Sequence, residues 1–360
     1  MRVTSWFSAT YAEGREKFLA ASGAAGAALQ SFRNPQAGPA GEMLYTDAAW
    51  LGPDDAKDVL FTCSGTHGVE GFCGSGIQVG SFRGGLFAGL PRGVAVLAVH
   101  AINPYGFAWV RRVTEDNVDL NRNFVDHGKP RPKNAAYDAI HAFLLPADWN
   151  GRARDQADRD LQQFIQEHGM AAFQAAVSGG QYDHADGLFY GGQAPTWSHN
   201  TILEIARRYC RGRRRVAFID YHTGLGPSGV GELICTHPTN SAGHKRSAEW
   251  FGEVTSPWDA SSVSAPVEGF IAGSLETILP ETELTSIAIE YGTFPVSEVL
   301  GALRADNWLH LRGEPASPLG QQIKREIRRA FYPDTDEWKE QVWRRAEAVS
   351  RMALRRLGDG

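Results

Sequence analysis

Five short, nearly uninterrupted apolar runs constrain the fold of this chain more than any other feature of its sequence. They cover residues 59–63, 94–102, 216–220, 231–237 and 286–292, and VAVLAVHAI at 94–102 is the clearest. A strand with one face in water alternates apolar and polar residues, whereas a continuous apolar run is typical of a strand buried on both faces. The runs are separated by segments long enough for helices. The pattern predicts an α/β fold with a mixed, mostly parallel central sheet flanked by helices on both faces.

Helical spacing or composition marks most of the remaining chain. We expect helices at 11–32, 70–88, 134–176, 199–211, 296–304 and 317–356. No internal repeat and no long linker divides the 360 residues. We therefore expect a single domain over residues 1–360, with a helical insertion at about 128–212.

Composition and charge exclude several classes of protein. The chain is 42% hydrophobic and 21% charged, as in folded enzymes, and its net charge of −5 gives no basic footprint for nucleic acid. It contains no apolar stretch of about 18 residues for a membrane span and no secretory signal at its start. The four cysteines form no C-x-x-C pair, which fits a reducing compartment. We expect a cytoplasmic protein that binds neither nucleic acid nor membrane.

The first candidate site residues follow the run that ends at Cys63. The segment THGVEG places His67 and Glu70 three residues apart, so one tight turn can direct both side chains to one point. A histidine and a glutamate at this spacing more often have a structural role. Their position at the carboxyl end of a strand favours a site, because α/β sheets bind ligands there.

A second histidine completes a set of metal ligands. His222 follows the run 216–220, where it is either a cap or a site residue. With His67 and Glu70 it gives two imidazoles and one carboxylate, the set that holds catalytic zinc and leaves a fourth position for water. The sequence thus predicts one Zn²⁺ ion. Asp119 and Asp220 are candidates to orient the histidines, although either could equally be a cap.

Two pairs of polar residues follow the run 94–102. Arg111 and Arg112 come first, and Asn121 and Arg122 stand in VDLNRNF. Near a metal, arginines can polarise a carbonyl group or clamp a carboxylate. The alternative is a solvated loop with local ion pairs to the acidic residues at 115–119.

One glutamate closes the last apolar run. Glu290, in SIAIEYG, is costly at the end of a buried strand unless it is partnered or functional. Beside a metal it can accept a proton from water. The alternative is a side chain that simply emerges into solvent.

Four motifs in one order give the sequence a family resemblance. HGVEG, NPYGF…RR…NVDLNRNF, DYHTG and IEYG span residues 67–290. Each is weak alone, but the ordered set resembles the M14 zinc carboxypeptidases and the related succinylglutamate desuccinylase/aspartoacylase group. Within that superfamily it is most similar to the branch DUF2817. The segments YAEGREKFL and GQYDHADGLFYGG extend the resemblance over nearly the whole chain, which implies a metallocarboxypeptidase-like catalytic domain.

The resemblance implies roles for the metal and proton-transfer residues. His67, Glu70 and His222 match the zinc ligands, and Glu290 matches the general acid/base. The implied function is a zinc-dependent hydrolase that cleaves an amide bond next to a free carboxylate. Its substrate would be a small peptide or an N-acyl amino acid.

The resemblance also implies roles for the residues that bind substrate. Asn121 and Arg122 match the pair that binds the free carboxylate, and Arg112 is our choice for the arginine that polarises the scissile carbonyl. The spacing differs from that of the classical carboxypeptidases, so Arg111 stays open for that role or for binding substrate. No tyrosine occurs at 223–289, where those enzymes carry a mobile one.

Two alternative functions remain open. One is an N-acyl amino acid deacylase of the aspartoacylase type, and the other is a catalytically silent protein that binds zinc and a carboxylate. A serine hydrolase is disfavoured because the chain contains no G-x-S-x-G. GLGPSG at 224–229 fits a dinucleotide fingerprint, but a strand-like run follows it where that site needs a helix.

Overall fold

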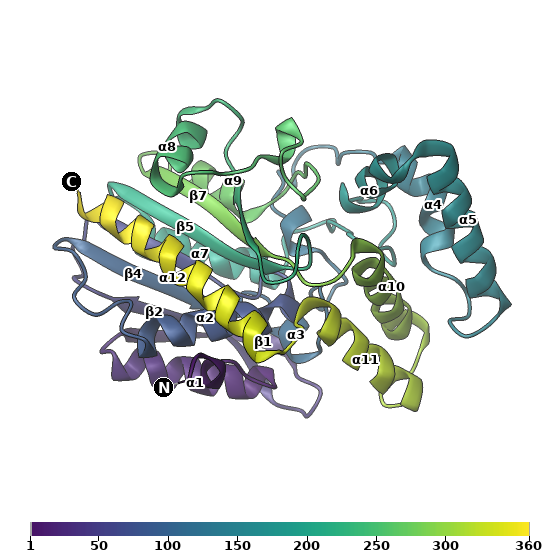
Figure 1. The fold of residues 1–360 in the computed structure, drawn as a ribbon, viewed down its shortest axis with the longest axis horizontal. Helices are drawn as coiled ribbons and strands as arrows, with labels where there is room; N and C mark the ends of the chain where they lie inside the picture. Colours follow the sequence, from purple (N-terminus) through teal and green to yellow (C-terminus); the bar gives the residue numbers. More distant parts are fainter. Residues whose placement is uncertain (1, 360) are drawn as a thin grey trace.

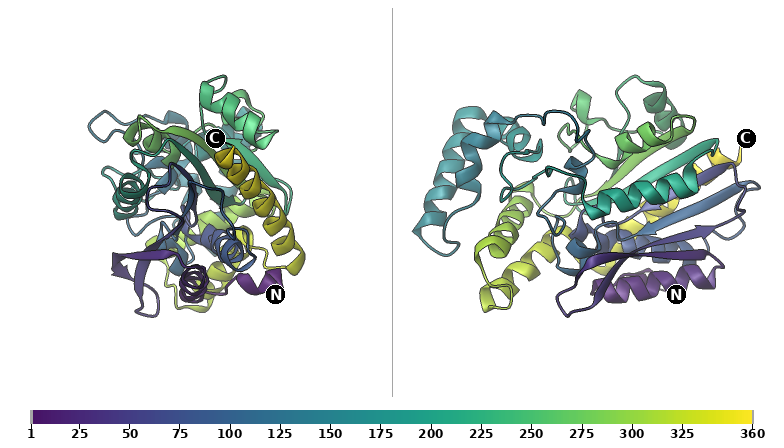
Figure 2. Two further views of the ribbon diagram at one scale, coloured as in Figure 1. Left: turned by 90° about the vertical axis from the view of Figure 1, so that its left-hand side faces the viewer. Right: turned by 180° about the vertical axis from the view of Figure 1, so that it is seen from behind.

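The computed structural model describes residues 2–359, and within them one seven-stranded sheet runs through the molecule (Figures 1 and 2). The strand order is β1-β2-β4-β3-β5-β7-β6. The strands are β1 (Ala28–Ala37), β2 (Met43–Leu51), β3 (Asp58–Cys63), β4 (Val94–His100), β5 (Arg215–Thr223), β6 (Gly231–Cys235) and β7 (Glu283–Tyr291). The central strands β4, β3, β5 and β7 pair in parallel, while β1, β2 and β6 join antiparallel at the two edges. The predicted mixed, mostly parallel sheet is confirmed.

Helices cover both faces of this sheet, as predicted. They are α1 (Tyr11–Ala24), α2 (Gly71–Arg83), α3 (Pro104–Ala108), α4 (Ala135–Leu144), α5 (Arg152–His168), α6 (Met170–Ser178), α7 (Trp197–Cys210), α8 (Ala242–Phe251), α9 (Ile271–Ile278), α10 (Val296–Arg312), α11 (Pro318–Phe331) and α12 (Asp336–Gly358). Helices α1, α2 and α12 share one hydrophobic cluster with the sheet, and α7 and α9 share the other. On β3, Leu60 belongs to the first cluster and Phe61 to the second, as the two-residue period of a strand requires. Among residues 2–359, no helix combines the length and apolarity that crossing a membrane requires.

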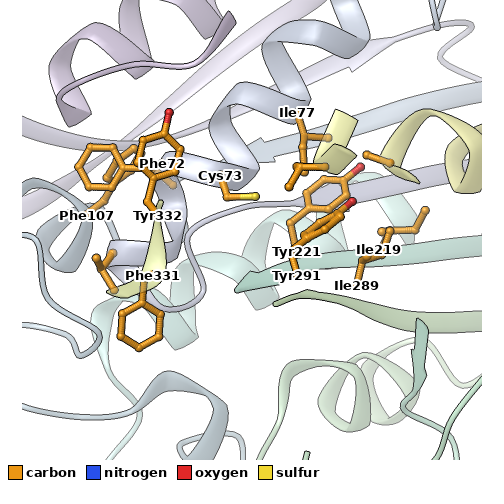
Figure 3. Packing of buried hydrophobic residues seen from close by; sticks show 14 of the residues in the cluster. Phe72, Cys73, Ile77, Phe107, Ile219, Tyr221, Ile289, Tyr291, Phe331 and Tyr332 are labelled. Carbon is orange, nitrogen blue, oxygen red and sulfur yellow. The ribbon is translucent and has the colours of Figure 1, made fainter. Parts of the chain in front are cut away.

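Aromatic side chains fill the core on the α2 face. Phe72 of α2 packs edge-on against Phe107 at 4.8 Å between ring centroids and stacks with Tyr332 at 5.6 Å. Figure 3 shows Tyr221 and Tyr291 side by side near Cys73, and both tyrosines are fully buried. These two rings fix the ends of β5 and β7 in the core.

The chain between β4 and β5 forms two distinct parts. Helices α4, α5 and α6 lie together at one end of the molecule, near α10 and beyond the sheet (Figure 1). Helix α7 instead packs on the sheet through Ile202 and Ile205.

The structure corrects the predicted helix at 11–32. This helix ends at Ala24, and Gly26 follows with a φ of 83°, a left-handed conformation that stops a helix and favours glycine. Residues 28–37 form the edge strand β1, which pairs with a second strand that we had not predicted, β2. Because most of β1 is exposed, it lacks the apolar pattern of a buried strand.

The predicted helical segment 317–356 is two helices, α11 and α12, separated at 332–335. Tyr332 precedes Pro333 and is extended, with φ −146° and ψ 90°, because proline disfavours the helical conformation in the residue before it. Helices α8 and α9 were also not predicted.

Truncating one buried side chain of the central strand β3 tests the packing of the sheet. We expect Leu60→Ala to lower the free energy of unfolding by about 2–5 kcal/mol, because Leu60 is fully buried between β4 and β5. Leu29→Ala is the matched control, since Leu29 is 42% exposed on β1 and should change stability by no more than about 0.5 kcal/mol. Urea denaturation measures both, and equal losses would contradict this core assignment.

Candidate functional site

The turn after β3 brings the first two candidate ligands together. His67 and Glu70 are buried, and His67 Nδ1 lies 2.8 Å from Glu70 Oε1 across a 3₁₀ turn at Gly68–Glu70. The backbone N–H of Gly68 donates to the carbonyl of Arg112 at 3.1 Å, which ties this turn to the loop after α3. The His-x-x-Glu spacing therefore places both side chains at one point, as the sequence predicted.

Strands β5 and β7 supply the next two residues. His222 and Glu290 are direct partners in the parallel ladder. Their neighbours Tyr221 and Tyr291 point into the core, so the two-residue period turns His222 and Glu290 to the opposite face. Both lie inside the strands rather than just beyond them, and both line one large cavity.

The three predicted ligands converge. One ligand atom from each of His67, Glu70 and His222 lies within 4.8 Å of the others. His222 Nδ1 is 3.0 Å from Glu70 Oε2. Its Nε2 lies 2.8 Å from Asp220, and His67 Nε2 lies 3.1 Å from Asp119. Metal-binding histidines are commonly oriented by a carboxylate in this way. Two imidazoles and one carboxylate, all buried, fit a divalent ion such as zinc.

The two glutamates of the site have pKa values shifted in opposite directions. Burial alone raises the pKa of Glu70, but the charges and hydrogen bonds of His67 and His222 outweigh it and hold that pKa well below its usual value. Burial raises the pKa of Glu290 to about 8, and the negative charge of Glu70 adds to the shift. Neighbouring carboxyl groups separated in this way can divide the roles of permanent anion and proton carrier.

The structure separates the two adjacent arginines. The Arg112 guanidinium donates to Asp119 at 2.9 Å and to Glu70 at 3.1 Å, and it lines the cavity. Arg111 turns away to Asp306 on α10 at 3.2 Å and does not line the cavity. Only Arg112 joins the other predicted site residues.

Backbone conformation around Arg112 is unusual. Val110, two residues earlier, has a φ of 52°, which a β-branched residue rarely adopts. Phe189 also has a φ of 52°, and its ring lies 5.0 Å below the Arg112 guanidinium. Conformations of this kind cost about 1–3 kcal/mol each and cluster at functional sites. The spacing of residues in the sequence does not predict the left-handed conformation of Val110 or Phe189.

Asn121 and Arg122 also line the cavity. Asn121 Nδ2 lies 3.4 Å from His222 Nε2, and its Oδ1 accepts from the N–H of Ile271 at 3.3 Å. The buried Arg122 donates to the carbonyls of Asn121 and Ser178, which uses two of its five N–H groups. The structure thus brings both residues to the wall beside His222.

A second group of side chains lies outside the cavity. The rings of His141 and His184 stack with 3.9 Å between their centroids. His141 Nε2 lies 3.3 Å from Asp186, and His184 Nε2 lies 2.9 Å from Asp138. His141, His184 and Asp186 could also hold a metal ion, but they are only partly buried and none of them lines the cavity.

The close contact between Gly68 and Gly106 can be tested by adding one methyl group. A Cβ at Gly68 would lie 2.0 Å from the backbone carbon of Gly106. We expect Gly68→Ala to lower stability by about 1–3 kcal/mol and to weaken metal binding, because the turn that carries His67 must shift. Gly23→Ala, whose Cβ would meet only Leu29 at 3.8 Å, is the control and should bind metal normally. Thermal unfolding and zinc titration measure both variants, and unchanged zinc affinity in Gly68→Ala would contradict this.

The chain is similar to several solved structures and to one protein family. A search of curated proteins finds no match. One similar solved structure is bovine thrombin-activatable fibrinolysis inhibitor in complex with tick carboxypeptidase inhibitor, with a TM-score of 0.47 and 12% identity over 96% of this chain and 97% of that one. Carboxypeptidase A from Helicoverpa armigera has a TM-score of 0.45 and 13% identity over 94% of this chain and 73% of that one. Murein-tripeptide amidase from Escherichia coli O157 has a TM-score of 0.36 and 17% identity over 80% of this chain and 93% of that one. The model of the family described as "Protein of unknown function (DUF2817)" matches residues 7–345. The chain therefore belongs to the DUF2817 family, which confirms the branch predicted from its motifs.

Proposed function

We propose that this protein is a zinc-dependent hydrolase that cleaves an amide bond next to a free carboxylate, as a carboxypeptidase does. The observation that carries the proposal is that the ligand atoms of the buried His67, Glu70 and His222 lie within 4.8 Å of one another. Glu290, on the strand next to that of His222, lines the same cavity. We place this chemistry in one catalytic domain over residues 1–360, with a helical insertion at about 128–212.

Zinc is the metal that the donor set favours. His222 would bind it through Nδ1, because its Nε2 faces Asp220, and Glu70 would bind through its carboxylate. His67 would be the third ligand; its Nε2 faces both Asp119 at 3.1 Å and the Arg112 guanidinium at 2.9 Å. A zinc ion bound there would supply Lewis acidity and lower the pKa of a water molecule towards about 7.

Glu290 is the proton carrier in this proposal. One of its carboxylate oxygens accepts from the N–H of Leu225 at 2.9 Å, and the other has no hydrogen-bond partner among the described residues. A pKa raised to about 8 by burial suits a group that takes a proton from the attacking water and returns it to the leaving amine.

Three residues would hold the substrate. Arg112, which donates to Glu70, would polarise the scissile carbonyl. Asn121 and Arg122 would bind the free carboxylate, because both line the cavity and a guanidinium suits a carboxylate. The buried ion pair with Asp306 favours a structural role for Arg111.

The same residues would serve an N-acyl amino acid deacylase. Peptides with a free C-terminus and N-acyl amino acids, tested side by side, separate the two substrates. A silent protein that binds zinc and carboxylate is less well supported, because binding needs no proton carrier such as Glu290.

Replacing the proton carrier tests the proposal. We expect Glu290→Gln to lower kcat by about 100- to 10,000-fold while the protein still binds about one zinc per chain, because the amide cannot accept the proton. Zinc content by atomic absorption and hydrolysis of both substrate classes measure the two properties.

Glu283→Gln is the matched control for that variant. Glu283 begins the same strand, is exposed and lies outside the cavity, so turnover should be unchanged. Near-normal turnover in Glu290→Gln would refute the role of Glu290. Wild-type turnover that persists after chelation of all zinc would refute the metal.

A further inference from the structure

The cavity that contains the candidate metal site extends well beyond it. Its volume is about 540 Å³, which lies in the range of sites that hold a ligand of drug size. The metal-site residues occupy one part of its wall. The rest comes mainly from α5, α6, α9 and α10, and we call this part the apolar chamber. Its apolar lining includes Leu161, Ile165, Phe173, Val177, Ile271 and Leu300.

Charged groups in the chamber wall are already paired. Arg304 donates to Asp158 at 2.7 Å and to the carbonyl of Leu144 at 3.0 Å, and Arg154 lies 3.6 Å from the same aspartate. These two arginines share the single carboxylate of Asp158, and backbone carbonyls hold the Arg304 guanidinium further. A ligand in the chamber would be recognised by its apolar surface.

Exposed apolar side chains are concentrated at this cavity. Among the residues that the structure describes, seven large hydrophobic side chains are exposed, and three of them line it. These are Met170 at 50% exposure, Trp258 at 42% and Val296 at 43%, each from a different element. Grouped exposed apolar surface marks binding sites, whereas scattered single residues do not.

We propose that the chamber binds a large apolar group of the substrate, attached next to the amide that is cleaved. The occupant follows from the continuity of the chamber with His67, Glu70 and Glu290, since a group lying there can be part of the same molecule. This assignment of the occupant rests on the proposed hydrolase function. The group is either the acyl chain of an N-acyl amino acid or the side chain of a C-terminal residue.

Two substrate series distinguish these two sources. The first is N-acylglycines from acetyl to dodecanoyl, and the second is N-acetylated dipeptides whose last residue ranges from alanine to phenylalanine. We expect kcat/KM to rise by about three- to fourfold per added methylene in the series that fills the chamber, until it is full. A rise in one series assigns that group to the chamber. Equal values along both series would overturn the proposal.

A matched pair of substitutions on α10 locates the effect. Leu300 lines the chamber, whereas Leu311, later on the same helix, is exposed and lies outside it. Leu300→Trp should reduce kcat/KM for the longest good substrate at least tenfold and leave the shortest substrate unaffected. Leu311→Trp should change neither. Loss of the chain-length preference in both variants, or in neither, would overturn the location.

Two methionines provide a second pair in case Leu300→Trp does not fold. Met170 lines the cavity at 50% exposure, and Met43 on β2 is 56% exposed and does not line it. Met170→Lys should weaken long-chain selectivity, because a charge enters the apolar rim, and Met43→Lys should not. The same effect in both would contradict the chamber.

Binding measured without turnover separates this proposal from the proposed function. We expect calorimetry to show decanoate binding to the wild-type protein at least tenfold more tightly than butyrate, and Leu300→Trp to lose that difference. Decanoate binding without hydrolysis of any amide would support the chamber and refute the hydrolase. Hydrolysis with no preference for apolar groups and no decanoate binding would refute the chamber and support the hydrolase.

Discussion

The buried carboxylate of Glu70 is the group on which the geometry of the site depends. One of its oxygens faces His67 and Arg112, and the other faces His222 and the backbone N–H of Thr223. A buried charge without partners costs several kcal/mol, so these contacts hold three separate segments of the chain in one arrangement. Metal binding requires neutral imidazoles. Burial disfavours a charged His222, but Asp220 and Glu70 outweigh it and raise the His222 pKa well above its usual value, so a cation held by Glu70 would compete with that proton.

Much of this arrangement could be predicted because parallel strands end at the same edge of a sheet. The apolar runs located β3, β5 and β7, and the polar residues at or just beyond their ends became candidates for one site. The pairs Tyr221–His222 and Glu290–Tyr291 place one ring in the core and one polar group on the opposite face. In the parallel register these polar groups, His222 and Glu290, become partners.

Other features could not be predicted, because they depend on backbone conformation or on contacts between distant segments. Arg111 and Arg112 are equivalent in spacing, and the left-handed conformation of Val110 precedes the turn that sends them in different directions. Strand β1 is mostly exposed and carries no buried pattern. The apolar chamber is likewise invisible in sequence, since residues as far apart as Leu161 and Leu300 each resemble ordinary core positions of an amphipathic helix.

The apolar chamber and the charged site affect each other through water. Burial is the largest cause of the raised pKa of Glu290. An apolar group seated in the chamber would displace water from the cavity that Glu290 shares with Glu70, which shifts the Glu290 pKa further in the same direction. The lower local dielectric would also strengthen the attraction between Arg112 and a developing negative charge. Thus an apolar substrate group would bring its own binding energy and strengthen the attraction to Arg112, while the higher pKa would favour the protonated form of Glu290, which donates to the leaving amine rather than accepting from water.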